Sequence, residues 1–302
     1  MASPLSPPRA KALAARIVKA HAGQAPRRLR PLSGGLTNHV FAVRVAGKDL
    51  VLRLNEDPAK LDDFLKEHWA MEQARAAGVP TPRMLEVRNC DEGPSYTIAE
   101  GVHGVSADSH PARCDVLRQL GACAARLHTV RADGFGRAFQ HKRWADCVAD
   151  ELKAQERLRL LARHGMLDEP VLQALLERAR HMARWRKPAV LHHGDLRLKN
   201  AIVEPATARL LAVIDWENCV ASPAPYWDLS IALHDIGVDE KEAFLEGYGL
   251  TPARFSHAAP FVTLFNVLNY APVVERALAA RDCHRIAWLR LRLKGAFDLH
   301  SP

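Results

Sequence analysis

Apolar positions in the first hundred residues recur with a helical period, then with a period of two, and then with a helical period again. Residues 8–22 have helical composition and end at a glycine, a common helix stop. Residues 40–45 and 50–54 are rich in apolar and β-branched residues on either side of a Gly-Lys-Asp turn, which predicts a hairpin of two strands. Residues 59–77 repeat apolar side chains every three or four positions and stop at Gly78. This order predicts a small sheet accompanied by one long helix.

Beyond residue 105 the pattern is mostly helical. Apolar positions at helical spacing predict amphipathic helices over residues 113–127, 151–163 and 171–186. Short apolar runs, which predict strands, follow at residues 189–191, 201–203 and 209–214. This second region is therefore expected to be a helical body that carries small hairpins.

The boundary between the two regions falls at Glu-Gly-Val-His-Gly, where a strand ends and two glycines follow. Glycine accepts backbone angles that other residues avoid, so this segment suits a hinge. A chain of 302 residues is long for one core and sufficient for two. We therefore expect an α+β fold with an N-terminal lobe of residues 1–99, a hinge of residues 100–104, and a mostly helical C-terminal lobe of residues 105–302.

The composition, with 48% hydrophobic and 25% charged residues, is typical of a soluble globular protein. The first eight residues contain no apolar stretch of the kind found in signal peptides. The most apolar late segment, residues 261–270, is shorter than the roughly 20 residues that a membrane span needs. The six cysteines form no Cys-x-x-Cys pair, which argues against a zinc site or a dense disulfide framework. We expect a cytoplasmic protein that does not bind membranes.

The formal net charge of +8 raises the question of a nucleic-acid partner. The densest basic runs, Arg27-Arg28-x-Arg30 and Arg290-x-Arg292-x-Lys294, contain no interleaved aromatic residues. Such runs are usually solvated surfaces, and a bound nucleotide also needs positive surroundings. We therefore expect no nucleic-acid partner, and the sequence gives no sign of an obligate protein partner.

Residues 191–200, Leu-His-His-Gly-Asp-Leu-Arg-Leu-Lys-Asn, are followed by Val-Ile-Asp-Trp-Glu at residues 213–217. Transfer of a γ-phosphoryl group needs a carboxylate that faces the acceptor hydroxyl, and a carboxylate and an amide that hold Mg²⁺. In the protein-kinase signature a catalytic Asp precedes a metal-binding Asn by five positions, and a second metal-binding Asp comes later. Asp195, Asn200 and Asp215 reproduce this arrangement. We predict Asp195 as the catalytic residue and Asn200 with Asp215 as metal ligands.

These motifs resemble those of the aminoglycoside phosphotransferase and choline kinase-like superfamily, whose fold is similar to that of protein kinases. The resemblance rests on His193-Gly194-Asp195-x4-Asn200 and on Ile214-Asp215-Trp216-Glu217, and it extends over nearly the whole chain. Looser segments, such as Val51-Leu52-Arg53-Leu54-Asn55, resemble the hygromycin B phosphotransferase subfamily. The resemblance implies a bilobal protein-kinase-like fold, ATP or GTP as the phosphoryl donor, and Mg²⁺.

A glycine-rich turn precedes the predicted hairpin of the N-terminal lobe. In such a turn, backbone N–H groups approach phosphate oxygens without a Cβ in the way. This gives four predicted nucleotide contacts, Ser33, Gly34, Gly35 and Thr37; a plain hairpin turn is the alternative. In the next strand, a period of two places Val51 and Arg53 on the same face. Arg53 stands where protein kinases have a Lys that contacts the α- and β-phosphates.

The partner of Arg53 is expected on the helix of residues 59–77. Helical spacing puts Glu67 in an apolar stripe with Phe64 and Met71, and a buried Glu needs a partner. Glu67 is therefore the predicted partner, Glu72 is the alternative, and a solvated glutamate is also open. By resemblance, Val51 packs on the nucleotide base and backbone groups of Glu100 and Val102 bind its edge; the sequence does not distinguish adenine from guanine.

Three further residues of the catalytic motif, and Asp228 beyond it, also have predicted roles. Arg197 and Lys199 could reach the moving phosphoryl group, and we predict this role, with solvated side chains as the alternative. His193 is interpreted as a residue that braces the loop. Asp228 either holds the backbone of the catalytic loop, as the resemblance implies, or simply caps the helix of residues 229–234.

The acceptor is the least determined part of the prediction. A polycationic aminoglycoside needs acidic walls, and several carboxylates lie late in the chain, namely Asp228, Asp235, Asp239, Glu240, Glu242, Glu246, Glu275 and Asp282. The basic net charge and the usual solubilising role of exposed carboxylates argue mildly against this reading. A quaternary ammonium could instead enter an aromatic box made of Tyr226, Trp227, Tyr270 and Trp288, although aromatic residues at such spacing usually belong to a core.

We predict a Mg²⁺-dependent O-phosphotransferase that uses ATP or GTP and a small hydroxyl-bearing acceptor, foremost an aminoglycoside-type antibiotic such as hygromycin. Kinases of choline, an amino alcohol or a sugar are the alternative. A protein kinase is disfavoured because no Asp-Phe-Gly or Ala-Pro-Glu element follows Asp215. A non-catalytic nucleotide-binding module is disfavoured because the catalytic acid, the pair of metal ligands and the phosphate-binding cation are all present.

Overall fold

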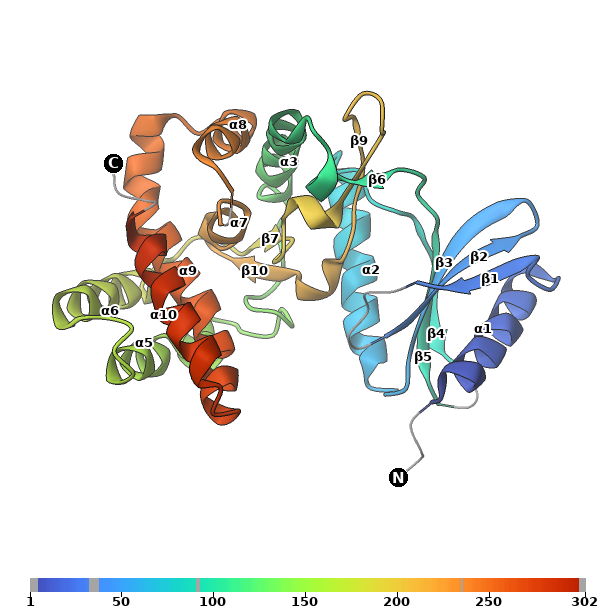
Figure 1. Ribbon diagram of the computed structural model, residues 1–302, viewed down its shortest axis with the longest axis horizontal. Helices are drawn as coiled ribbons and strands as arrows, with labels where there is room; N and C mark the ends of the chain where they lie inside the picture. The colour runs from blue at the N-terminus through green and yellow to red at the C-terminus, as the bar shows by residue number, and fades with distance from the viewer. Residues whose placement is uncertain (1–4, 33–37, 91–92, 235, 299–302) are drawn as a thin grey trace. The chain divides into compact units, whose positions relative to one another are not determined.

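The computed structural model describes residues 5–32, 38–90, 93–234 and 236–298. Its contacts divide the chain into two compact units. The first, called the N-terminal unit here, consists of residues 1–111 and 199–217; the second, the C-terminal unit, consists of residues 112–198 and 218–302. Figure 1 shows the elements of both units.

The N-terminal unit is built on an antiparallel sheet of five strands in the order β1-β2-β3-β5-β4. Its strands are β1 (Arg28–Pro31), β2 (His39–Val45), β3 (Lys48–Asn55), β4 (Met84–Asn89) and β5 (Ser95–Glu100). The predicted hairpin is β2–β3, and its turn is tight because Ala46 and Gly47 both have positive φ, at 50° and 76°. The sequence pattern therefore predicted the centre of this sheet correctly.

The alternation along β3 separates the two faces of the sheet. Leu50, Leu52 and Leu54 are buried in a core with α1 (Pro7–Ala22), the predicted first helix, which ends at Gly23 with φ 72°. Val51 and Arg53 point to the opposite face, on the side where α2 (Lys60–Ala76) packs against β4 and β5. Figure 1 shows α1 and α2 on opposite sides of this sheet. One face is thus a dry core, and the other is left for a binding site.

A second, three-stranded sheet belongs to the same unit. Its order is β6-β8-β9, formed by β6 (Val105–Ser106), β8 (Ala201–Val203) and β9 (Leu210–Val213). The Val213 N–H donates to the Pro80 carbonyl at 2.8 Å, which joins this hairpin to the segment after α2. Packing therefore groups residues 199–217 with the N-terminal part of the chain, whereas the sequence assigned them to the C-terminal lobe. The lobe boundaries expected from the sequence, at residues 99 and 105, stay a prediction.

The two glycines of the expected hinge are required by close backbone contacts. A Cβ on Gly104 would lie 2.5 Å from the Val203 carbonyl oxygen, and one on Gly101 would lie 3.1 Å from the Asp49 backbone. The Gly101 N–H also donates to the Asp49 carbonyl at 2.8 Å. Both glycines therefore allow the chain to pass closely between the two sheets of this unit.

The C-terminal unit is mostly helical, as predicted. Its helices are α3 (Arg113–Leu127), α4 (Trp144–Asp150), α5 (Ala154–Arg163), α6 (Glu169–Ala183), α7 (Tyr226–Ala232), α8 (Val238–Tyr248), α9 (Pro252–Ala279) and α10 (Cys283–Asp298). Two short strands, β7 (Val190–His192) and β10 (Val220–Ser222), pair antiparallel. A large apolar cluster that includes Trp144, Trp227 and Phe265 fills the space between α4, α6, α7 and α9. The α+β fold class is thus confirmed.

Two predicted helix boundaries were wrong. The helix expected over residues 151–163 begins at Ala154, because Lys153 has a left-handed backbone with φ 47°, and residues 151–153 connect it to a separate helix, α4, which ends at Asp150. The helix expected from Leu229 begins at Tyr226, so Asp228 lies inside its first turn. The late apolar segment of residues 261–270 is the middle of α9. Among the helices in the described ranges, none is long and apolar enough to cross a bilayer.

Candidate active site

A cavity of about 360 Å³ opens on the face of the N-terminal sheet that carries Val51 and Arg53. Its lining contains six of the predicted site residues, Val51, Arg53, Glu67, Glu100, Val102 and Asp215. They come from β3, α2, the end of β5, the segment after it, and the residues after β9, so a single pocket gathers positions up to 164 residues apart in the sequence. Its size is within the range of small-molecule sites, which is roughly 300–1,000 Å³.

Arg53 and Glu67 form the ion pair that the sequence predicted. The Arg53 guanidinium donates to Glu67 Oε2, and its Nε also donates to Thr97 Oγ1 at 3.3 Å. The guanidinium lies over the Phe64 ring, 5.1 Å from its centroid. Glu72, the alternative partner, pairs instead with Arg75 at 2.8 Å on the exposed side of α2. The pair therefore ties α2 to β3 in the cavity wall and fixes the orientation of the guanidinium.

Glu67 is almost fully buried, with 1% of its surface exposed. Burial raises the pKa of its carboxyl above the ordinary value, although the charge and hydrogen bond of Arg53 act in the opposite direction. Within the described residues, Glu67 Oε1 has no hydrogen-bond partner. An unsatisfied carboxylate oxygen next to a cationic guanidinium leaves room in this cavity for a further donor or cation.

The predicted metal ligands lie at one end of the β8–β9 hairpin. Ala201 pairs with Val213, and the Ile214 N–H donates to the Asn200 carbonyl at 2.9 Å, so Asn200 just before β8 lies beside the residues just after β9. Asp215 follows with φ 68°, a backbone angle that is uncommon outside glycine and that clusters at functional sites. A carboxylate and a carboxamide are the oxygen donors that Mg²⁺ accepts. The residues present therefore fit such an ion.

The remaining predicted nucleotide contacts lie in two segments. The glycine-rich turn with Ser33, Gly34, Gly35 and Thr37 lies outside the described residues. At the end of β5, the N–H groups of Glu100 and Gly101 donate to Arg83 and Asp49, whereas the Val102 N–H has no acceptor among the described residues. Among the N–H groups of this segment, that of Val102 is therefore the predicted donor to the edge of a base.

The catalytic loop belongs to the C-terminal unit and is held by Asp228. The Asp228 carboxylate is fully buried and accepts hydrogen bonds from the N–H groups of His193, at 2.9 Å, and Gly194, at 2.8 Å. Gly194 has φ 78°, and a Cβ there would lie 1.8 Å from the Asn218 carbonyl oxygen. His193 Nδ1 accepts from the Asp195 N–H at 3.2 Å. The loop-holding reading of Asp228 and the bracing role of His193 thus agree with the geometry, and Asp228 is not the cap of α7.

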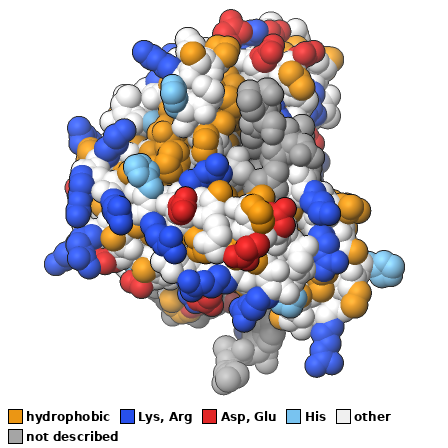
Figure 2. Space-filling model, turned by 90° about the vertical axis from the view of Figure 1, so that its left-hand side faces the viewer, with side chains coloured by type: hydrophobic (Ala, Val, Ile, Leu, Met, Phe, Trp, Pro, Cys, Tyr) orange, Lys and Arg blue, Asp and Glu red, His pale blue; other side chains and the backbone are white. Residues whose placement is uncertain are grey.

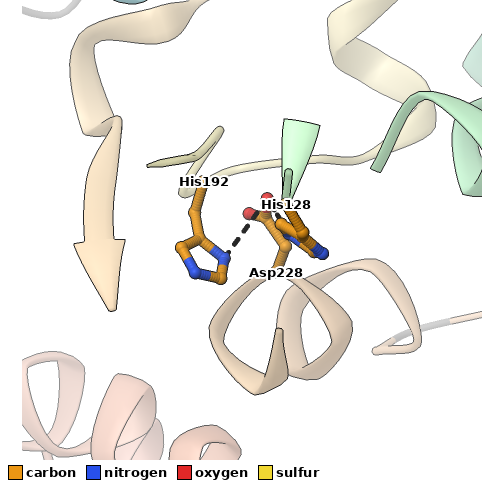
Figure 3. A group of neighbouring side chains, drawn as sticks. All are labelled: His128, His192 and Asp228. Atoms are coloured by element: carbon orange, nitrogen blue, oxygen red, sulfur yellow. Dashed lines mark hydrogen bonds and ion pairs between the residues drawn. The ribbon is translucent and has the colours of Figure 1, made fainter. Parts of the chain in front are cut away.

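Two histidines adjoin Asp228, as Figure 3 shows, and His128 supports its carboxylate. His128 Nε2 lies 3.2 Å from Asp228 Oδ2, and its Nδ1 lies 2.9 Å from the Tyr248 hydroxyl. The Ser222 hydroxyl donates to the Ala224 carbonyl at 2.7 Å, so it accepts from His192 Nε2 at 2.9 Å. His192 Nδ1 then carries a lone pair 3.7 Å from Asp228 Oδ2.

Both ionisation states in this cluster follow from burial and neighbouring charge. Burial alone would raise the pKa of Asp228, but the hydrogen bond from His128 and the neighbouring histidines outweigh it and lower that pKa below its ordinary value. Burial, followed by the nearby His128, lowers the pKa of His192 to about 3. His128, His192 and Asp228 have the composition of a metal site. Because both Asp228 oxygens already accept backbone N–H groups, we interpret the cluster as a hydrogen-bonded support.

The sequence did not identify His128, Ser222 or Tyr248 as part of this support. A single serine or tyrosine carries no motif, and both reach the cluster from other elements. Only the position of His128 directly after α3 could have suggested its role.

Arg197 and Lys199 occupy different surroundings. The Arg197 guanidinium forms an ion pair with Asp195 Oδ1, and Asp195 itself is 7% exposed. Lys199 lies in a short 3₁₀ turn (Leu198–Asn200) and is exposed. Arg197 is thus beside the predicted catalytic carboxylate. The predicted action of both cations on the γ-phosphoryl group stays a prediction.

Most of the carboxylates suggested by the sequence as an acidic wall form ion pairs or hydrogen bonds with other groups of the protein. Asp228 holds the catalytic loop, Glu240 pairs with Arg113 and accepts from the Gly237 N–H, and Glu246 pairs with Arg118. Glu275 lies 3.5 Å from Arg157. The Asp282 side chain accepts from the Arg285 N–H at the start of α10. Asp239 and Glu242 are exposed, and Asp235 lies outside the described residues.

The aromatic box is also absent among the described residues. Trp227 is buried against Phe265, and Tyr226 stacks on Phe261 with a centroid distance of 5.5 Å. Tyr270 and Trp288 lie in a different place, under the guanidinium of Arg292. The protein's own arginine therefore covers the ring faces that a quaternary ammonium would need.

A five-stranded antiparallel sheet with an Arg–Glu pair between strand and helix, and a His-Gly-Asp loop held by a buried aspartate, define a kinase-like phosphotransferase class. The model of the phosphotransferase enzyme family, APH, matches residues 28–259, and the chain belongs to this family. The match covers the sheet, the cavity, the catalytic loop and the residues that support it.

Two relatives and one solved structure illustrate the family. Hygromycin-B 4-O-kinase of Escherichia coli is 24% identical over 216 residues, which are 66% of this chain and 60% of that enzyme. An aminoglycoside 3'-phosphotransferase of Streptomyces fradiae is 27% identical over 213 residues, 62% of this chain and 73% of that protein. A thermostable mutant of aminoglycoside phosphotransferase APH(4)-Ia, in a ternary complex with AMP-PNP and hygromycin B, has a TM-score of 0.68 at 19% identity, covering 95% of this chain and 98% of that chain.

The matched region thus spans less than two thirds of the length of the hygromycin-B 4-O-kinase. The structural likeness, at 19% identity, confirms the protein-kinase-like fold that the sequence resemblance implied.

Proposed function

We propose that the protein is a Mg²⁺-dependent O-phosphotransferase that moves the γ-phosphoryl group of ATP or GTP to a hydroxyl of a small molecule. The observation that carries the proposal is the cavity of the N-terminal unit, which places the Arg53–Glu67 pair, Val51 and Asp215 around one space. A guanidinium held by a buried glutamate is suited to nucleotide phosphates, and an apolar side chain is suited to a base.

The acceptor side is assigned to the catalytic loop. Asp195 would orient the acceptor hydroxyl and take its proton as the bond between the β–γ bridging oxygen and the γ-phosphorus breaks and the bond to the acceptor oxygen forms. The fixed backbone of His193 and Gly194 keeps the Asp195 carboxylate in one position, which favours this role. Arg197 and Lys199 would balance the charge of the transferred group.

Asn200 and Asp215 would hold Mg²⁺, and their position at the same end of the β8–β9 hairpin supports this assignment. Such an ion, held by these two side chains, would supply positive charge that neutralises the phosphate oxygens. The role of the chain itself is to present the two oxygen ligands from a short, rigid hairpin.

An aminoglycoside is the acceptor class suggested by the names of the two relatives. A small metabolite with a hydroxyl group is the second candidate, and one observation favours it: most carboxylates that could surround a polycation form ion pairs with arginines or hold backbone N–H groups. Choline is the least favoured metabolite, because Arg292 lies over Tyr270 and Trp288.

The test is an acceptor panel with the purified full-length chain. Hygromycin B, 3'-hydroxyl aminoglycosides, amino alcohols and sugars are each incubated with ATP or GTP and Mg²⁺, and the mass gain of one phosphoryl group is measured by mass spectrometry. EDTA is expected to abolish the gain. If nucleotide binds but no acceptor across the panel is phosphorylated, a non-catalytic nucleotide-binding module becomes the better reading.

A further inference from the structure

A groove of about 1210 Å³ in the C-terminal unit has no residue assigned to the active site in its lining. It is formed by α4, α5, α6 and the segments that join them, and its floor consists of alanine, valine and leucine side chains such as Val148, Ala162 and Ala183. Its volume exceeds the roughly 300–1,000 Å³ of ordinary small-molecule sites. The groove therefore has room for more than an ordinary small molecule.

Six cationic side chains border this groove: Lys153, Arg159, Arg163, Arg180, Arg184 and Arg186. All six are exposed, and the lining contains only two carboxylates, Glu156 and Glu169. Figure 2 views the side of the molecule where α5 and α6 lie, and Lys and Arg side chains gather over its left and lower parts. The groove is thus a strongly basic surface with an apolar floor.

These cations lack the partners that other arginines of the same unit have. Within the described ranges, none of the six forms an ion pair. By contrast, Arg113, Arg118 and Arg157 each pair with a glutamate. Like charges gathered around an apolar floor repel each other, and an anionic partner would relieve that repulsion.

The positions of the cations form two rows. Arg159 and Arg163 are four residues apart on α5, and Arg180 and Arg184 are four residues apart on α6, so each pair lies on one face of its helix. Small residues of the floor, Ala162 and Ala183 among them, allow the backbone of a partner to approach closely. Two basic rows beside a narrow apolar floor match a helix whose apolar stripe is flanked by carboxylates.

We propose that this groove docks an acidic amphipathic helix of a partner protein. A nucleic acid fits the groove less well, because its lining contains no aromatic side chain on which bases could stack. The proposal does not depend on the phosphotransferase assignment, since the groove and the active site share no residue.

The test uses a labelled synthetic helix of roughly 18 residues, about five turns, with leucine and alanine at i, i+3, i+4 and i+7 and glutamates on both flanks. Its binding to the full chain is followed by fluorescence anisotropy, and its helicity by circular dichroism. We expect saturable binding, a gain of helicity, and weaker binding as salt rises. The double substitution Arg159→Glu and Arg180→Glu is expected to weaken binding by at least about tenfold.

The matched control reverses two exposed cations of α1 with the same change of net charge, Lys11→Glu and Lys19→Glu, and should leave affinity within about twofold, since neither side chain lines the groove and exposed charges are screened by salt. Both variants should retain wild-type thermal unfolding and nucleotide binding. No saturable binding, equal binding of a scrambled peptide, or an equal loss in both variants would overturn the proposal. Tight binding of a single-stranded oligonucleotide that is lost only in the groove variant would assign the surface to nucleic acid instead.

Discussion

At the scale of single residues, the candidate site depends on side chains that hold other groups in place. Asp228 accepts two backbone N–H groups of the catalytic loop, His128 holds Asp228 in turn, and Tyr248 holds His128. Asp195 is therefore held both by the fixed backbone before it and by the ion pair of its carboxylate with Arg197. A carboxylate placed in this way reacts without first reorganising its surroundings.

The most direct residue-scale prediction concerns Asp195. Asp195→Asn keeps the size of the side chain and removes the carboxylate that takes the acceptor proton. We expect kcat to fall by about 10²–10⁴-fold, the usual contribution of a general base, while nucleotide affinity stays near the wild-type value. Steady-state kinetics and calorimetric titration with a non-hydrolysable nucleotide measure the two effects. Near-normal turnover in this variant would remove Asp195 from the mechanism.

A second residue-scale prediction concerns the Arg53–Glu67 pair. Glu67→Gln removes the charge that orients the Arg53 guanidinium, so the KM for nucleotide is expected to rise by at least about tenfold, equivalent to about 1.4 kcal/mol. Glu72→Gln is the matched control on the exposed side of the same helix, and it should leave the KM unchanged. Equal effects of the two substitutions would show that the pair does not act on the nucleotide.

At the scale of elements, α3 and α8 meet backbone to backbone. A Cβ on Gly121 of α3 would lie 2.1 Å from the Phe244 carbonyl oxygen, and one on Gly247 of α8 would lie 1.9 Å from the Arg118 carbonyl oxygen. His128 directly follows α3, and Tyr248 is the last residue of α8. The close contact of these two helices therefore brings together the pair of side chains that supports Asp228.

This contact gives the element-scale prediction. Gly247→Ala forces the two helices apart, and we expect it to lower the free energy of unfolding by about 1–3 kcal/mol, as overpacking does, and to reduce turnover through Asp228. Gly237→Ala at the start of the same helix is the control, because the nearest atom to its added Cβ is 3.8 Å away and its φ is −70°. Urea unfolding checks the first effect and kinetics the second. A Gly247 variant as stable and active as the control would contradict this account.

At the scale of the whole molecule, two histidines that stay neutral, the buried His192 and the half-buried His234, make stability depend on pH. The pKa of His192 is lowered to about 3, and burial together with the charge of Arg292 lowers that of His234 to about 4. Below pH 6.5 the unfolded chain binds a proton at each position and the folded chain does not. The free energy of unfolding therefore decreases as the pH is lowered. Asp228, whose pKa is lowered, adds to this loss below its ordinary value of 3.8. Glu67, whose pKa is raised, acts in the opposite sense.

We therefore expect the free energy of unfolding to decrease between pH 6.5 and 4, by at most about 1.4 kcal/mol per pH unit for each histidine. Urea unfolding at intervals of half a pH unit measures the slope. His192→Gln, which keeps a donor for Ser222, should remove the contribution of one histidine proton from the slope. A slope identical in the variant and the wild type would mean that His192 is already protonated in the folded protein.

The sequence by itself determined the elements and the chemistry of the motif. The alternation along β3 predicted the faces of Leu52 and Arg53, the helical stripe of α2 predicted the burial of Glu67, and the spacing of Asp195, Asn200 and Asp215 indicated the reaction class. These features are local, because a period or a spacing within one segment is enough to specify them. Boundaries set by a single backbone angle, such as that of Lys153, carry no such signal.

Only the tertiary structure decided which side chains already interact with other groups of the protein. The carboxylates suggested as walls for a polycation are engaged by arginines from α3 and α5 and by the catalytic loop, and Arg292 covers the rings suggested for a quaternary ammonium. The same holds for the basic groove, whose cations come from two helices and look like ordinary surface residues in the sequence. Pairing between distant segments depends on the path of the whole chain, and no pattern within one segment contains that information.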